Sequence, residues 1–371
     1  MEFPIFELER VQSLYENTVE INLTESGVHP LTLAELLTTE QLETLHTTGL
    51  GYGQTNGSEL LRRRIAALYD RLGPDNVLVT NGSAEANFVA CHTLLEPGDE
   101  VVVMQPNYQQ IWGVVEAMGA HPVAFHLRES DGWAPDLDEL RNAVTDATRM
   151  IAVCNPSNPT GHVLRGDDMA EIADIADAVG AWLHSDEVYR GAELAGDETP
   201  SFMGLAERVT VVAGLSKAYA LPGLRVGWIV GPTDTVATAW AYHDYTSITA
   251  GTISHMVGAV ALSPEVRPRI LERTRTLLRC NLAVVSRWVE SMHGRFHFTP
   301  PAAGGFAYLR YDLPVGSTEL SDWLRTAHGV FVLAGDCFGM DRFIRIGIGT
   351  ETHTLERGLD RIGTALRDRF G

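Results

Sequence analysis

The chain has 371 residues, of which 45% are apolar and 20% are charged, and its formal net charge is −20 at pH 7. This length and composition predict a folded protein of two domains and exclude global disorder. The negative charge argues against nucleic acid and anionic membrane surfaces as partners, because both attract positively charged proteins.

The cysteines and the N-terminus indicate the compartment. Cys91, Cys154, Cys280 and Cys337 lie far apart and form no CxxC pair, which predicts reduced thiols and neither a disulfide framework nor a metal site. The N-terminus lacks the basic region of a signal peptide, and no apolar run is long enough to cross a bilayer. We therefore expect a soluble, cytoplasmic protein with no nucleic-acid or membrane partner.

Helix and strand patterns alternate from about residue 58 onwards. The predicted elements are, in chain order, a helix in SELLRRRIAALYDRL, a strand in NVLVTNG, a helix in SAEANFVACHTLL, a strand in DEVVVMQP, a helix in YQQIWGVVEAMG, strands in HPVAFHL and RMIAVCNP, a helix over 167–179, and strands in AWLHSDEV, RVTVVAGLS and RVGWIVG. This order predicts an α/β domain whose largely parallel sheet has helices on both faces. Ligands of such sheets bind at the carboxyl ends of the strands.

The pattern changes after residue 250. A long helix is predicted over roughly 264–292, followed by strands in GGFAYLRYDL, GVFVLAG and RFIRIGIG and a final helix from Leu355 to Arg369. We interpret residues 46–255 as a large domain and residues 256–371 as a smaller α/β domain. Residues 1–45 are expected to pack with the small domain and the active site.

Lys217 is the only lysine in the chain, so every other strongly basic side chain is an arginine. Arginine replaces lysine as a surface charge or a phosphate partner, but it does not readily lose its proton and is a poor nucleophile. A single retained lysine therefore indicates amine chemistry, with a Schiff base as the obvious form.

Four stretches follow predicted strands and carry polar groups suited to a cofactor. They are NGSAEAN (81–87), NPSNPTG (155–161), SDEVYR (185–190) and VVAGLSKAYALPGLRVGW (211–228). In this order they resemble the class I and II aminotransferases, which are pyridoxal 5′-phosphate (PLP) enzymes of fold type I. The resemblance extends from YGQTNGSELLRRRIA to RFIRIGIG, which is nearly the whole chain.

The resemblance implies roles for the residues around the cofactor ring. Lys217 would form the Schiff base and then shuttle protons as a free amine. Asp186 would pair with the pyridinium nitrogen so that the ring can accept electrons. Tyr189 and Asn158 would hydrogen-bond the ring hydroxyl oxygen, and Tyr108 would stack on the ring, although ordinary core packing stays open for Tyr108.

The resemblance also implies a phosphate cup made of Ser83, Ala84, Ser216 and Arg225, which combines helix-end donors with a fixed cation. Tyr52 matches a tyrosine that reaches the phosphate of a neighbouring subunit, which implies a homodimer with shared sites, unless Tyr52 stays within its own subunit. One departure from the family pattern is Gly214, where a serine commonly helps to hold the phosphate.

The expected substrate is an L-α-amino acid. By resemblance Arg345 would hold its α-carboxylate, with a surface ion pair as the alternative, and Gly27 and Asn158 would lie beside it. His29 follows Gly27 where the family usually has a Pro-Asp type sequence, so it is a candidate for contact with the distal part of the substrate. A turn histidine satisfied by backbone groups is the alternative.

The stretches SGVH and DYTSI, the latter with Tyr245, resemble capreomycidine synthases, PLP enzymes of natural-product biosynthesis that eliminate a side-chain hydroxyl and close a guanidine ring. The chain thus resembles enzymes that share an external aldimine and a quinonoid and then diverge. Transamination is the first expectation. Elimination, replacement or cyclisation of a hydroxyarginine is the alternative.

Four N-terminal carboxylates stand near the SGVH stretch in the sequence, namely Glu7, Glu9, Glu16 and Glu25. Two interpretations stay open for them: they bind a guanidinium or another substrate cation, or they form an ordinary solvated face.

Overall fold

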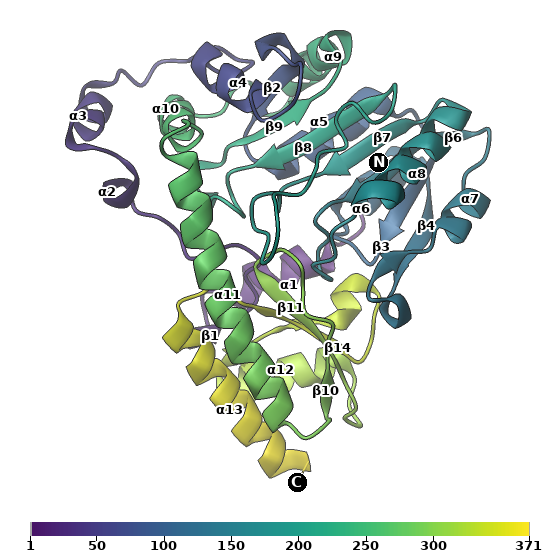
Figure 1. The fold of residues 1–371 in the computed structure, drawn as a ribbon, viewed down its shortest axis with the longest axis vertical. Coiled ribbons are helices and arrows are strands. Elements are labelled where there is room, and N and C mark those ends of the chain that lie inside the picture. The colour runs from purple at the N-terminus through teal and green to yellow at the C-terminus, as the bar shows by residue number, and fades with distance from the viewer. Residues whose placement is uncertain (1, 371) are drawn as a thin grey trace.

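The computed structural model describes residues 2–370, which form a large sheet and a smaller one, drawn one above the other in Figure 1. The large sheet has eight strands, in the spatial order β2 (Val77–Thr80), β9 (Gly227–Val230), β8 (Val209–Gly214), β7 (Trp182–Asp186), β6 (Thr148–Cys154), β3 (Glu100–Gln105), β4 (His121–Arg128) and β5 (Ala134–Pro135). The strands from β8 to β4 are parallel, whereas β2, β9 and β5 pair antiparallel. The predicted α/β fold with a largely parallel sheet is confirmed.

Helices cover both faces of the large sheet. They are α4 (Glu59–Ala66), α5 (Ser83–Leu94), α6 (Gln110–Met118), α7 (Leu137–Ala143), α8 (Gly166–Val179), α9 (Thr233–His243) and α10 (Thr252–Ala261). In β3, Val101 and Val103 pack into a cluster with α6, whereas Val102 and Met104 join the cluster that contains α8. This alternation follows from the two-residue period of a strand.

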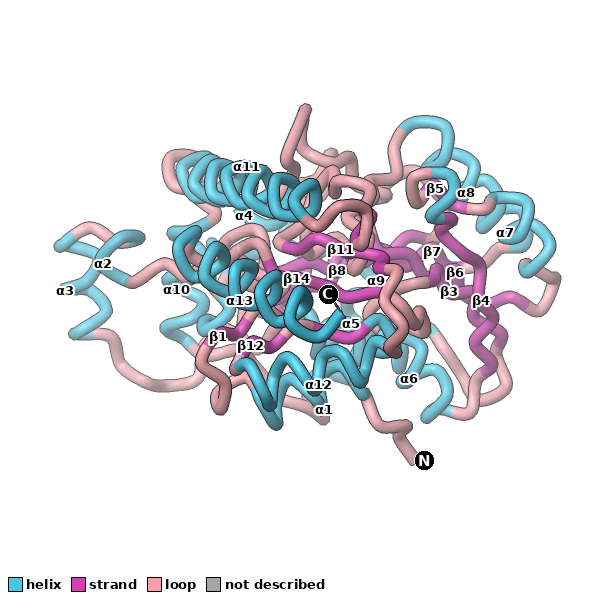
Figure 2. The backbone as a smooth tube through the Cα atoms, turned by 90° about the horizontal axis from the view of Figure 1, so that it is seen from below, coloured by secondary structure: helices cyan, strands magenta, loops and turns pink. Residues whose placement is uncertain are grey.

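The smaller sheet has four antiparallel strands, in the order β10 (Phe296–His297), β11 (Phe306–Tyr311), β14 (Phe343–Gly347) and β13 (Leu333–Ala334). Its helices are α11 (Arg267–Ser291), α12 (Ser317–His328) and α13 (Thr352–Phe370). Figure 2 shows α13 between α11 and α12. Short 3-10 helices lie at Pro74–Asn76, Glu129–Asp131, Pro222–Leu224 and Gly335–Phe338.

The N-terminal segment contacts the C-terminal part of the chain through a two-stranded sheet. It contains α1 (Glu7–Tyr15), β1 (Ile21–Asn22), α2 (Leu33–Leu36) and α3 (Thr39–Thr47). The strand β1 pairs in parallel with β12 (Val330–Phe331), so residues more than 300 positions apart in the sequence lie side by side. The domain boundaries at residues 45 and 255 stay a prediction, although every strand of the large sheet lies between them.

The helix α4 is shorter than the sequence pattern predicts. It ends at Ala66, because the amides of Leu68 and Tyr69 bond three residues back rather than four. The turn carries Tyr69 into the core, where its hydroxyl accepts a hydrogen bond of 3.1 Å from Trp228. Burial of the ring thus outweighs the helical pattern of the following residues.

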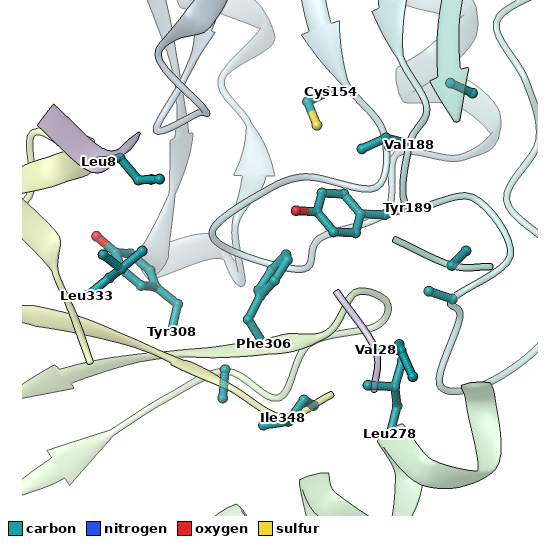
Figure 3. Close-up of a cluster of buried hydrophobic side chains, with 14 of the residues drawn as sticks. Leu8, Val28, Cys154, Val188, Tyr189, Leu278, Phe306, Tyr308, Leu333 and Ile348 are labelled. Atoms are coloured by element: carbon teal, nitrogen blue, oxygen red, sulfur yellow. The ribbon is translucent and has the colours of Figure 1, made fainter. Parts of the chain in front are cut away.

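Aromatic side chains connect the large sheet to the smaller sheet. Figure 3 shows Tyr189, which follows β7, pointing toward Phe306 of β11, and their ring centroids are 5.2 Å apart with the planes at 88°. Edge-to-face contacts of this kind add to the free energy gained by burying the rings. None of the helices between residues 2 and 370 combines the length and the apolarity that a membrane-spanning helix requires.

Gly227 of β9 lies directly against the start of α5. A Cβ atom on Gly227 would overlap the carbonyl group of Gly82 and the nitrogen of Ser83. We expect Gly227→Ala to lower the free energy of unfolding by about 3 kcal/mol, because backbone atoms cannot move aside as a flexible side chain can.

Urea denaturation measures this change against Gly223→Ala, whose Cβ would meet no atom within 4 Å. Equal stability of the two variants would contradict the tight approach of β9 to α5.

Candidate active site

A cavity of about 190 Å³ lies where the large sheet, the small sheet and the N-terminal segment meet. Eight of the residues predicted from the sequence line it: Ser83, Ala84, Tyr108, Asn158, Asp186, Tyr189, Lys217 and Arg345. Asp186 ends β7, and Asn158 and Lys217 follow β6 and β8 within four residues. The carboxyl ends of the parallel strands thus bring together groups that are far apart in the sequence.

The Lys217 amine is held by a residue that the sequence analysis missed. Its Nζ donates a hydrogen bond of 2.9 Å to Ser26 Oγ, and the Tyr189 hydroxyl donates one of the same length to the same oxygen. Burial lowers the pKa of Lys217, against the attraction of Glu25. A lowered pKa increases the fraction of neutral amine, which is the nucleophilic form. The only sequence signal for Ser26 was its place next to Gly27.

The Asp186 carboxylate is fixed by neighbours on both oxygens. Its Oδ2 accepts a hydrogen bond of 2.9 Å from Asn87 Nδ2, and its Oδ1 accepts one of 3.1 Å from the Val188 amide. Asn87 Oδ1 lies 3.1 Å from His184 Nε2, and His184 Nδ1 lies 2.9 Å from the Thr210 hydroxyl. Burial raises the pKa of Asp186. A cation beside this carboxylate would therefore be bound favourably.

Asn87 and His184 were missed, although both carry a sequence signal. His184 lies two positions before Asp186 in the same strand, so the two side chains share one face of the sheet. Asn87 lies one helical turn after Ser83, the first residue of α5.

Arg345 of β14 is buried in the cavity wall, with 1% of its surface exposed. Its Nη1 donates a hydrogen bond of 2.8 Å to Asn158 Oδ1, and its Nη2 donates one of 2.6 Å to the Thr24 carbonyl oxygen. Its Nε is buried with no partner, and no carboxylate within residues 2–370 forms an ion pair with it. A buried guanidinium without an anion is costly, so this site favours an anionic ligand.

The start of α5 and Arg225 form an anion cradle. The first backbone N–H groups of a helix have no acceptor within it, and here they belong to Ser83 and Ala84. Gly82, with φ of +91°, leaves no room for a Cβ because the Arg225 guanidinium occupies that space. A Cβ on Gly214 would lie 2.9 Å from the Val226 carbonyl oxygen, which explains why a serine is disfavoured there.

Tyr108 faces the cavity from the side of the N-terminal helix. Its hydroxyl donates a hydrogen bond of 2.5 Å to Glu9, and its ring centroid is 4.7 Å from that of Phe6. Burial and the nearby Glu9 charge raise the pKa of Tyr108. The ring is thereby held at the cavity by α1.

The remaining predicted residues lie elsewhere or beside the cavity. Gly27 lies next to Lys217, since a Cβ on it would be 3.8 Å from Lys217 Cδ. His29 lines a separate surface groove beside α11, with its Nε2 3.9 Å from Glu351, so this chain does not bring it to the cavity. Tyr52 and Tyr245 are 87% and 91% exposed and do not line the cavity either.

The family model for class I and II aminotransferases matches residues 19–362. The chain belongs to this family. It is 35% identical to capreomycidine synthase of Streptomyces vinaceus, covering 94% of this chain and 91% of the relative. It is 29% identical to an arginine–pyruvate transaminase of Pseudomonas aeruginosa, over 86% of this chain and 83% of that one.

Among solved structures, a PLP-dependent aminotransferase from Streptococcus suis matches with a TM-score of 0.94, 32% identity and 99% coverage of both chains. An aromatic aminotransferase from Pyrococcus horikoshii matches with a TM-score of 0.87 and 26% identity, covering 98% of this chain and 99% of the other. The protein is thus a PLP-dependent enzyme of the aminotransferase family.

The cavity fits this cofactor in two independent ways. The cradle of α5 and Arg225 suits a phosphate group. The buried Asp186, already oriented by Asn87, suits a protonated ring nitrogen. Among residues 2–370, no group of three or more histidine, cysteine, aspartate or glutamate side chains is arranged to hold a metal ion.

His184 gives a pH-dependent prediction. Burial lowers its pKa from 6.5 to about 4, so the unfolded chain takes up a proton between these values that the folded chain does not. The stability that depends on neutral His184 is therefore complete above pH 6.5 and falls as the pH drops toward 4. In His184→Gln, the loss of unfolding free energy between pH 7 and pH 5 should be smaller by about 2 kcal/mol.

Urea denaturation at both pH values tests this, with His121→Gln, at an exposed position of β4, as the control. The same pH dependence in His184→Gln and the parent protein would contradict the buried neutral imidazole.

Proposed function

We propose that the cavity binds PLP beside Lys217 and an L-α-amino acid against Arg345, and that the enzyme transfers the amino group of that amino acid. The observation that carries the proposal is the convergence, in one cavity, of the only lysine of the chain, a buried carboxylate and a buried guanidinium without a carboxylate partner. When bound, PLP supplies an aldehyde that condenses with amines and a ring that withdraws electrons from the α-carbon.

Lys217 serves as the amine that links to the cofactor and as the base that moves the proton at the substrate α-carbon. Its lowered pKa supports both roles, because each needs an unprotonated amine. Ser26 Oγ orients Nζ through its hydrogen bond of 2.9 Å. Gly27 lies beside the Lys217 side chain, and a Cβ on it would lie 3.3 Å from the Ser216 carbonyl oxygen.

The Asp186 carboxylate would accept a hydrogen bond from the protonated ring nitrogen. Asn87 keeps Asp186 Oδ2 in position. Tyr189 and Asn158 donate to the ring hydroxyl oxygen. Asn158 Oδ1 already accepts from Arg345, which leaves its Nδ2 as the donor. Tyr108 supplies the aromatic face against the ring, held in place by Glu9.

The phosphate group is held by Ser83 and Ala84 at the start of α5, by Ser216 and by Arg225. The positive end of the helix dipole and the arginine charge both favour a doubly charged phosphate. Gly214 contributes no hydroxyl, so the remaining donors and the Arg225 charge carry the binding.

Arg345 holds the α-carboxylate of the substrate, which is the anion that its buried guanidinium lacks. With the carboxylate fixed there, the α-carbon would lie in the same cavity as Lys217. Bound PLP would take up the amino group, and water would supply the oxygen of the keto acid that is released; a second keto acid would then have to accept the amino group to restore the aldehyde of the cofactor.

A second candidate is a reaction of the capreomycidine synthase type, in which a side-chain leaving group is expelled and a ring is closed. The specific observation in its favour is the 35% identity to such an enzyme over 94% of this chain. Both reactions begin with removal of the α-proton by Lys217, so the residues named above serve either one. This candidate would give the enzyme a role in natural-product biosynthesis.

We also propose a cytoplasmic homodimer in which Tyr52 reaches the phosphate of the neighbouring subunit. Large apolar side chains are exposed together on the loop around Tyr52 and on the segment that it packs against, including Leu50, Tyr245 and Ile248. Exposed apolar clusters of this kind favour a protein interface. The four cysteines are free thiols, which is consistent with a reducing compartment.

Replacing the lysine tests the covalent link. Borohydride treatment of the holoenzyme should attach one cofactor per chain to the peptide that contains Lys217, because no other lysine exists to compete. Lys217→Ala should lose this label and the visible absorbance of the linked cofactor, while the cradle still binds PLP. Mass spectrometry of the reduced peptides measures the label, and a full label in the variant would refute the role of Lys217.

A single-turnover experiment tests the reaction. Purified holoenzyme is mixed with a panel of L-amino acids, including arginine and its hydroxylated forms, and both cofactor and product are identified by mass. We expect pyridoxamine phosphate together with a keto acid, because transfer leaves the amino group on the cofactor. Recovery of PLP together with a dehydrated or cyclised product would replace transamination with the second candidate.

A further inference from the structure

Three carboxylates of the N-terminal segment also line the cavity. Glu9 and Glu16 lie seven residues apart along α1, so they share one face of the helix, and Glu25 follows β1. The buried Leu8 and Gln12 fix the helix over the cavity, and Gln12 Nε2 donates a hydrogen bond of 3.0 Å to the Thr24 hydroxyl. We call Glu9, Glu16 and Glu25 the acidic wall.

Within residues 2–370 no ion pair of 4 Å or less joins Glu9, Glu16 or Glu25 to a basic side chain, and only the more distant charges of Lys217 and Arg345 attract Glu9 and Glu25. Glu16 is half-buried, and Glu9 and Glu25 line the cavity while part of their surface is exposed. Burial, together with the charges of Glu25 and Glu9, raises the pKa of Glu16. The three carboxylates thus repel one another and favour a positive charge among them.

The basic side chains that line the cavity leave its carboxylates without a balancing positive charge. Among its lining residues, Lys217 and Arg345 are the basic side chains, and both are committed by the proposed function. Lys217 would be used by the cofactor when it is linked to it and would be neutral when it acts as a base, and Arg345 would pair with the α-carboxylate. Neither charge is then left to balance the acidic wall.

The opposite charges that line the cavity point to one ligand. Arg345, buried and with an unpartnered Nε, marks the place of a carboxylate, and the acidic wall marks the place of a cation. Glu9 still has a free oxygen, because the Tyr108 hydroxyl bonds its Oε1 only. A molecule with a carboxylate at one end and a cationic side chain at the other satisfies both walls.

We propose that the substrate is an L-α-amino acid with a cationic side chain, a guanidinium or an ammonium, and that Glu9, Glu16 and Glu25 bind that cation. This inference rests on the proposed function, because it needs the α-carboxylate at Arg345. It deepens the proposed function by naming the substrate class. A neutral side chain would leave three like charges unbalanced in one cavity, so the site rejects neutral amino acids of the same length.

The test compares pairs of amino acids that differ in charge and little in shape. The holoenzyme is titrated with L-arginine against L-citrulline for the guanidinium, and with L-lysine against L-norleucine for the ammonium. The absorbance change of the bound cofactor gives the half-saturating concentration. We expect the cationic member of one pair to saturate at a concentration about tenfold lower or more, and the pair that shows this difference identifies the cation.

Two variants and a control connect the preference to the acidic wall. Glu16→Gln and Glu25→Gln keep the shape and remove the charge, and each should raise the half-saturating concentration of the cationic amino acid about tenfold while leaving its neutral partner unchanged. Glu7→Gln is the matched control, because Glu7 is a carboxylate of the same helix that lines a different groove. It should behave like the parent protein.

The outcomes separate this inference from the proposed function. Equal half-saturating concentrations for the charged and neutral amino acids overturn the acidic wall as a binding site. A preference for the charged amino acid that survives in Glu16→Gln and Glu25→Gln overturns it as well. Reaction with neutral amino acids alone overturns it too, while leaving the proposed function intact. If no amino acid changes the cofactor absorbance, the proposed function and this inference fail together.

Discussion

The buried guanidinium of Arg345 is the constraint on which the arrangement of the site depends. It lies in the small sheet, donates to Asn158 beyond β6 of the large sheet, and donates to the Thr24 carbonyl of the N-terminal segment. Arg345 therefore joins three parts of the chain, and its side chain is almost fully buried. Each hydrogen bond offsets part of the cost of burying the charge, but only an anion offsets the rest. The Arg345 guanidinium thus lacks an anionic partner at the place where the substrate carboxylate is proposed to bind.

The same junction positions the N-terminal helix. Thr24 accepts from Arg345 through its carbonyl and from Gln12 through its hydroxyl, so the helix α1 is tied to the guanidinium by two successive hydrogen bonds. Tyr108 adds a second tie through Glu9. Because α1 is anchored at both points, Glu9 and Glu16 are held at the cavity, where they keep part of their exposure to solvent. A segment that could have been a flexible terminus becomes one wall of the site.

Much of the fold and of the cofactor site could be predicted from the sequence. The alternation of helices and strands predicted the parallel sheet, and strand ends bearing Asp186, Asn158 and Lys217 predicted the edge at which the cavity forms. The end of α4 could not be predicted, because the contact of Tyr69 with Trp228 joins residues 159 positions apart. Ser26 was missed for a similar reason. Its neighbours Lys217 and Tyr189 are local only in the folded chain.

His29, Glu9 and Glu16 show that distance along the sequence from Gly27 does not decide which side chains reach the cavity. The chain bends at Gly27, and the His29 amide then donates to the Gly349 carbonyl at 2.7 Å, which carries the imidazole away from Lys217. Glu9 and Glu16, much further from Gly27 in the sequence, reach the cavity because seven residues are nearly two helical turns. Periodicity along a helix is thus a better guide to shared space than adjacency in a loop. By that criterion α1 contributes to the site through one face, while Glu7, on another face, takes no part in it.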